Sequence, residues 1–231
     1  MCLVTVHESA DDLRGYQDHP AHLEVADWIR PRLARVVISA LYGALALIQA
    51  ALAVRLARSG LWIPSAVAVG VAYDSAVVGA GRLIGEGPGL EALSTGRFAA
   101  HAVLTPLLVV HAAVLVRRGL VAPAWGLAGA LVVFDAVGLA DLRLEPRWWS
   151  DTLRHVSADP SGPPIAALVT TVILLAAGVA LWVRRRTPWL LLGAAVLLVT
   201  AGAAAASPIL GNAGEAVLIA AIAATGGRDG G

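Results

Sequence analysis

The chain contains no lysine, so all seventeen of its Lys and Arg residues are arginines. A Schiff base between a lysine amine and retinal or pyridoxal phosphate is therefore excluded. Cys2 is the single cysteine, which rules out an internal disulfide and a site built from several thiolates. Charged residues make up only 14% of the 231 residues, against about a quarter in soluble domains. The net charge of +1, without a basic stripe between aromatic residues, gives no indication of nucleic-acid binding.

Hydrophobic residues account for 58% of the chain and fall in long blocks without the alternation of strands. This pattern predicts an all-α protein, a polytopic bundle of about seven transmembrane helices. We expect a single membrane domain over residues 1–231, in which residues 1–33 form a polar N-terminal tail. The predicted spans lie near residues 36–54, 61–84, 98–116, 120–141, 165–183, 188–207 and 211–226.

The connections after the first, third and fifth predicted spans are short, and arginine is their only charged residue. These arginines are Arg55, Arg58, Arg117, Arg118 and Arg184 to Arg186. Because basic loops stay in the cytoplasm, we expect an outside N-terminus and a cytoplasmic C-terminus in the plasma membrane.

Two longer connections are expected on the opposite side. Residues 82–97 are rich in glycine and charge, and they predict a surface loop between the second and third spans. Residues 143–164 include the pair Trp148 and Trp149, which favours a short interfacial helix.

Four titratable residues fall inside the apolar spans: Asp74, His101, Asp135 and Glu215. An aspartate in hydrocarbon costs at least about 2.5–3.5 kcal/mol, so such groups indicate function. If the spans run alternately up and down, all four reach a similar depth on the N-terminal side of the membrane. We therefore expect them to share one pocket and to act as its catalytic residues.

Neighbouring polar side chains are expected to line the same pocket and bind substrate. At 100° per residue, Asp74 shares a face with Gly70 and Gly81, and small residues mark the faces on which membrane helices pack closely. The predicted substrate-binding residues are Tyr42, Tyr73, Thr105 and Asn212.

Carboxylates in an apolar cavity suit acid–base chemistry, since two acids in different surroundings can divide the roles of acid and base. The spans contain no aspartate-rich motif for a magnesium diphosphate, no His-Glu-x-x-His pair and no Gly-x-Ser-x-Gly turn. We accordingly expect no metal and no cofactor.

In size, seven-helix layout and the placement of acids on early and last helices, the chain resembles the small integral membrane terpene cyclases. The resemblance implies a lyase or isomerase that protonates an alkene or epoxide of a lipid-soluble isoprenoid substrate, drawn from the membrane lipid. Asp74 and Glu215 would then serve as acid and base, in either order.

Two other classes fit the same residues. A proton-coupled transporter could use the acids as a relay, and Thr105-Pro106 would permit a helix break. A structural or partner-binding subunit would need only the helix faces. A polar path below the acids would favour transport, whereas only Gln49 and His111 lie there. The sequence thus favours the enzyme.

Overall fold

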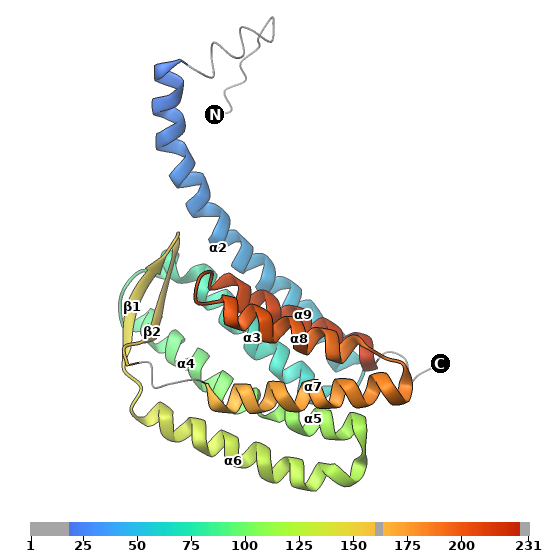
Figure 1. Cartoon of the computed structure of the whole chain (residues 1–231). Coiled ribbons are helices and arrows are strands. Elements are labelled where there is room, and N and C mark those ends of the chain that lie inside the picture. The colour runs from blue at the N-terminus through green and yellow to red at the C-terminus, as the bar shows by residue number, and fades with distance from the viewer. Residues whose placement is uncertain (1–18, 160–163, 227–231) are drawn as a thin grey trace, which may run out of the picture.

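The computed structural model describes residues 19–159 and 164–226, which form helices and one two-stranded sheet (Figure 1). The helices are α2 (Pro20–Arg58), α3 (Trp62–Ile84), α4 (Pro88–Leu104), α5 (Leu107–Val116), the 3₁₀ turn η1 (Arg118–Leu120), α6 (Val121–Ala140), α7 (Ile165–Arg185), α8 (Trp189–Ala203) and α9 (Ile209–Gly226). The strands are β1 (Leu144–Trp149) and β2 (Thr152–Ser157). The predicted all-α bundle is confirmed.

Among the described residues, six helical segments are long and apolar enough to cross a membrane. They are Val37–Arg58, Trp62–Ile84, Pro88–Val116, Arg118–Ala140, Ile165–Arg185 and Ile209–Gly226. The sixth predicted span, near residues 188–207, corresponds to α8, which is apolar but only 15 residues long, short of the roughly 20 that a span needs. α8 packs along α9, so these two helices form an antiparallel pair at one side of the bundle (Figure 1).

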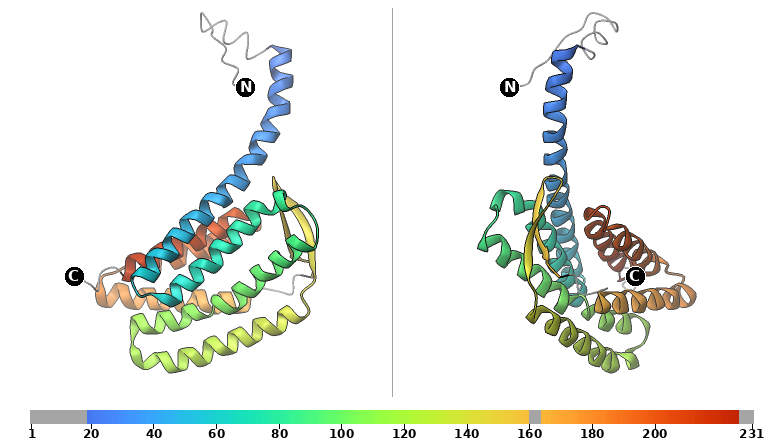
Figure 2. Two further views of the ribbon diagram at one scale, coloured as in Figure 1. Left: turned by 180° about the vertical axis from the view of Figure 1, so that it is seen from behind. Right: turned by 60° about the vertical axis from the view of Figure 1, so that its left-hand side comes forward.

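The first helix begins earlier than predicted. α2 starts at Pro20 rather than near residue 36, so part of the expected polar tail is helical. Proline suits the first turn of a helix because its missing N–H has no partner there in any case, and the His19 Nδ1 atom caps the turn by accepting from the Ala21 N–H at 3.2 Å. The N-terminal part of α2 extends beyond the other helices (Figure 2). Residues 1–18 lie outside the described residues.

The loop predicted over residues 82–97 is wrong for most of its length. Only residues 85–87 are non-helical, between the end of α3 and the start of α4. Gly85 and Gly87 there adopt φ angles of 81° and 150°, which other residues rarely tolerate. Pro88 then begins α4. A second break separates α4 from α5 at Pro106, which cannot donate a backbone hydrogen bond.

The interfacial helix predicted within residues 143–164 is also wrong, because the segment forms a β-hairpin. β1 and β2 pair antiparallel, from Leu144 opposite Ser157 to Trp149 opposite Thr152. Ser150 turns the chain with a φ of 53°. The hairpin covers one end of the bundle, beside α3 and α4 (Figure 2).

Close contact with α3 fixes the hairpin in place. Leu153 is fully buried against Val77 and Leu90, and a Cβ atom on Gly81 would collide with the Leu153 carbonyl. At the turn, the Asp151 carboxylate accepts a hydrogen bond from the Ser39 N–H of α2 at 3.1 Å. Gly81 therefore allows β2 to lie close to α3, and the hydrogen bond between Ser39 and Asp151 holds the hairpin there.

The main hydrophobic core lies in the opposite half of the bundle, toward the arginine-containing connections. Its fully buried members come from six helices and include Leu56, Leu174, Leu190, Ile219 and Ile222. This core closes the bundle below the half that the hairpin covers.

Replacement of Gly81 tests the docking of the hairpin. Gly81→Ala should lower the free energy of unfolding by about 1–3 kcal/mol, since the new methyl group meets a backbone carbonyl. Gly138→Ala on α6 is the matched control, because its Cβ has open space and alanine favours a helix by about 1 kcal/mol over glycine. Unfolding of the purified proteins in detergent measures both, and an equal effect at the two positions would contradict the docking contact.

Candidate functional site

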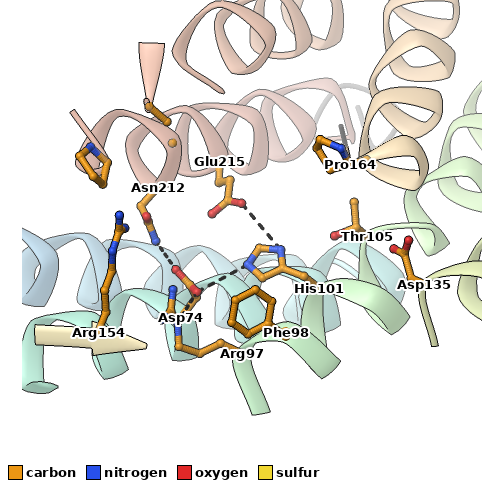
Figure 3. A pocket seen from close by; sticks show the side chains of 14 residues that line it. Asp74, Arg97, Phe98, His101, Thr105, Asp135, Arg154, Pro164, Asn212 and Glu215 are labelled. Carbon is orange, nitrogen blue, oxygen red and sulfur yellow. Dashed lines mark hydrogen bonds and ion pairs between the residues drawn. The ribbon is translucent and has the colours of Figure 1, made fainter. Parts of the chain in front are cut away.

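A cavity of about 440 Å³ lies in the hairpin-covered half of the bundle (Figure 3). Its volume falls within the roughly 300–1,000 Å³ typical of small-molecule sites. α3, α4, α6, α9 and β2 supply its polar side chains, and the start of α7 adds apolar ones. The polar lining residues are Asp74, Arg97, His101, Thr105, Asp135, Arg154, Asn212 and Glu215. The four predicted catalytic residues therefore all line one cavity.

Asp74 on α3 is the most deeply buried of these acids, with 5% of its surface exposed. Its Oδ1 atom accepts a hydrogen bond from Arg97 Nε at 2.6 Å, and its Oδ2 atom accepts one from the Asn212 amide of α9. Asn212 also donates to the Ser75 hydroxyl at 3.1 Å. Charge-assisted hydrogen bonds of this kind are stronger than neutral ones, so they fix the carboxylate in place.

Arg97 is a site residue that the sequence analysis placed in a surface loop. It lies on α4 one turn before His101, so both side chains project from the same face of the helix. The Arg97 side chain is only 12% exposed, and its Nη1 atom is buried without a hydrogen-bond partner among the described residues. A helix predicted to begin at Pro88 would have included both Arg97 and His101 and placed them on one face.

The His101 ring lies between two carboxylates (Figure 3). Its Nε2 atom is 3.7 Å from Asp74 Oδ1, and its Nδ1 atom is 3.9 Å from Glu215 Oε1. The His101 side chain is 38% exposed, which gives it access to the cavity. Small movements of the ring would bring either nitrogen within hydrogen-bond distance of its carboxylate.

Glu215 approaches from α9, one turn after Asn212, so the same helix face presents both residues to Asp74 and His101. Within the described part of the chain, His101 is its nearest charged partner, and Glu215 makes no hydrogen bond. Asp135 lines the far wall from α6 and is separate from this group (Figure 3). We call Asp74, His101 and Glu215 the acid cluster.

The predicted substrate-binding residues divide into two pairs. Thr105 and Asn212 line the cavity, as expected. Tyr73 and Tyr42 do not. The Tyr73 hydroxyl donates to the Leu93 carbonyl at 2.8 Å, and Tyr42 is fully buried beside the cavity with no hydrogen bond from its hydroxyl among the described residues.

Arg154 is a second lining residue that the sequence analysis missed, because it belongs to the unpredicted hairpin. It enters the cavity from β2, and its Nε atom is buried without a hydrogen-bond partner in the described residues. Burial lowers the pKa of its guanidinium, although an arginine remains protonated in proteins.

The acid cluster also has the composition of a metal site, since one ligand atom from each residue lies within 4.8 Å of the others. Both oxygens of Asp74 already accept hydrogen bonds, however, and the Arg97 cation lies against one of them. A guanidinium at that position repels a second cation. The arrangement therefore favours proton transfer over metal binding.

Comparisons with protein-family models, with curated proteins and with solved structures give no match to this chain. Its function is inferred from the cavity itself.

A double-mutant cycle tests the central ion pair. Arg97→Gln should lower the free energy of unfolding by about 3–5 kcal/mol because it leaves the Asp74 charge buried and unpaired. Adding Asp74→Asn should recover much of this loss, since neither charge then remains. Detergent-based unfolding of the two single variants and the double variant measures the coupling energy.

The matched control is the hairpin pair Arg147–Glu145, whose side chains are 59% and 45% exposed. Its coupling energy should stay within about 1 kcal/mol, as for other surface pairs. If the coupling energy of Arg97 and Asp74 is no larger than that of this surface pair, their ion pair does not hold the site together.

Proposed function

We propose that the chain is a membrane-embedded enzyme that performs acid–base chemistry on a lipid-soluble substrate of the isoprenoid type. The observation that supports this most is the position of the His101 imidazole between Asp74 and Glu215, on the wall of a cavity within the apolar bundle. Proton transfer by a positioned side chain accelerates reactions by about 10²- to 10⁴-fold.

The surroundings of the two carboxylates divide their roles. Asp74 is neutralised by Arg97 and held by Asn212, which suits it to orient His101. Glu215 makes no hydrogen bond with the described residues, and its ion-pair partner there is His101, so it is the group free to exchange a proton with substrate. In a cyclisation of the terpene-cyclase kind, Glu215 protonates an alkene or epoxide. The cyclised cation then returns a proton to the Glu215–His101 pair, and no redox cofactor is needed.

The packing of α6 supports access from the bilayer. No residue of α6 after Leu131 is buried, and Val133, Phe134 and Val137 are more than half exposed. The same half of the helix carries Asp135 on the cavity wall. This loosely packed half of α6 is where we infer that a substrate dissolved in the membrane enters the cavity sideways.

The floor of the cavity favours an enzyme over the alternative, a proton-coupled transporter. Below the acid cluster, the Gln49 amide donates to the Asn212 carbonyl at 3.2 Å and is fully buried. His111 lies among buried apolar residues of α5. The hydrophobic core then fills the rest of the bundle. A transported ion would have to cross this layer, in which the described residues form no continuous polar path.

For orientation, we propose that the arginine-containing connections face the cytoplasm and the hairpin faces outward. The helices place Arg58, Arg117 and Arg184 at one end and the hairpin at the other. The positive-inside rule then puts the N-terminus and the cavity on the outer side of the plasma membrane.

Lipid analysis of a heterologous host tests the proposed enzyme. Cells that express the wild type should contain a changed lipid, detected by mass spectrometry of their extracts. Glu215→Gln keeps the shape of the side chain but removes its titratable proton, so it should reduce product by about 10²- to 10⁴-fold. His101→Gln should act similarly. The control Glu91→Gln removes an exposed carboxylate of α4 and should leave the product unchanged.

A different outcome would establish the transporter. The enzyme proposal fails if the wild type changes no lipid but carries a pH-dependent flux in proteoliposomes that Glu215→Gln abolishes.

Thiol labelling tests the orientation. In a Cys2→Ser background, Asp159→Cys beside the hairpin should react with an impermeant maleimide in intact cells. Ser59→Cys, between α2 and α3, should react only after permeabilisation. Labelling of both positions from one side would contradict the arrangement, and the reverse pattern would invert the proposed orientation.

A further inference from the structure

Two of the described arginines enter the cavity, and of these only Arg97 has an acidic partner within the described residues. The Arg154 side chain makes no hydrogen bond or ion pair with the residues that the structure describes, and its Nε atom is buried. A buried N–H of a guanidinium without a partner costs free energy, because it has lost water and gained no hydrogen bond in exchange. A native protein tolerates this cost at positions where a ligand supplies the missing partner.

The hairpin adds to the cost at Arg154. The residue directly opposite on β1 is Arg147, and like charges at facing positions of a sheet repel. Arg147 is exposed and pairs with Glu145 at 2.8 Å, so its own charge is satisfied. The hairpin thus has one arginine paired in solvent and one directed into the cavity without a partner.

Arg97 adds a second guanidinium at the same end of the cavity. Its Nε atom binds Asp74, but its buried Nη1 atom has no partner in the described part of the chain. Arg154, Asn212 and Arg97 gather at one end of the cavity, whereas Thr105 and Asp135 lie at the other (Figure 3). The cavity therefore has a cationic end, beside Asp74, and a separate acidic wall.

We propose that the cationic end, formed by the guanidinium groups of Arg154 and Arg97, binds the anionic head group of the substrate, a phosphate or carboxylate. The guanidinium group matches the oxygens of such anions with two parallel hydrogen bonds. This inference rests on the proposed function for the identity of the substrate as a lipid, but binding can be measured without turnover. A head group held by arginines needs no magnesium, consistent with the missing aspartate-rich motif.

Binding of three probes to the full chain, purified in a neutral maltoside detergent, tests the proposal. The probes are dodecyl phosphate, dodecanol and inorganic phosphate, each measured by calorimetric titration. Dodecyl phosphate should bind, and dodecanol should bind much more weakly. Arg154→Gln should weaken dodecyl phosphate binding roughly tenfold to a hundredfold, the usual effect of losing hydrogen bonds to a charged group.

Arg147→Gln is the matched control, since it removes the facing arginine of the same hairpin outside the cavity; its affinity should change by much less than that of Arg154→Gln. Equal affinities of the Arg154→Gln and Arg147→Gln proteins would overturn the proposal, as would equal binding of dodecyl phosphate and dodecanol. If Arg154→Gln does not fold, Arg154→Lys replaces it. Lysine keeps the charge but not the paired hydrogen bonds, so affinity should fall several-fold, and an unchanged affinity would overturn the proposal.

Two further measurements distinguish a free anion from a lipid head group, and the anion site from the proposed enzyme activity. Tight, Arg154-dependent binding of inorganic phosphate alone would support the anion site and assign it to a free ion rather than a lipid head group. Glu215→Gln should bind dodecyl phosphate at least as tightly as the wild type, because it removes a carboxylate from the cavity. A protein that binds the probe in this way but changes no lipid would retain the anion site and refute the enzyme.

Discussion

The burial of the Asp74–Arg97 ion pair is the interaction on which the rest of the site depends. Removing two charges from water costs several kcal/mol per ion, and their attraction offsets this only when geometry and further hydrogen bonds are good. Here the 2.6 Å contact and the Asn212 amide meet that condition. These bonds fix α3, α4 and α9 at one depth. His101 and Glu215, each one turn from a member of the group, are thereby placed beside each other.

The bundle divides stability and chemistry between its two halves. Toward the arginine-containing connections, a continuous apolar core packs six helices together. Toward the other end, the helices separate around the cavity, and the β-hairpin covers them. The hairpin is held by the close approach at Gly81 and by the bond between Asp151 and Ser39. It also contributes Arg154, so one element both shields the cavity and supplies a charge to it.

The amino-acid sequence predicted the helical bundle and the shared depth of Asp74, His101 and Glu215, because span length and the helical repeat determine both. It did not predict Arg97, since Gly85 to Gly87 suggested a long loop and Pro88 in fact begins a helix. Tyr73 was assigned to the cavity beside Asp74, yet consecutive helical residues point about 100° apart, so both cannot face it.

Pairing between distant residues accounts for the remaining difference. Arg154 was missed because β1 and β2 pair with each other and pack against Gly81 and Ser39. Such long-range contacts cannot be predicted from the local hydrophobic periodicity of the sequence.

The central claim is that Asp74, His101 and Glu215 act as one proton-transfer unit. Its most direct test is the rate of lipid conversion by the purified protein in Asp74→Asn, His101→Gln, Glu215→Gln and the triple variant. Residues that act together lose rate non-additively. The triple variant should therefore be about as slow as the slowest single variant. Losses that multiply across the three positions, or a wild type that converts no lipid, would contradict the claim.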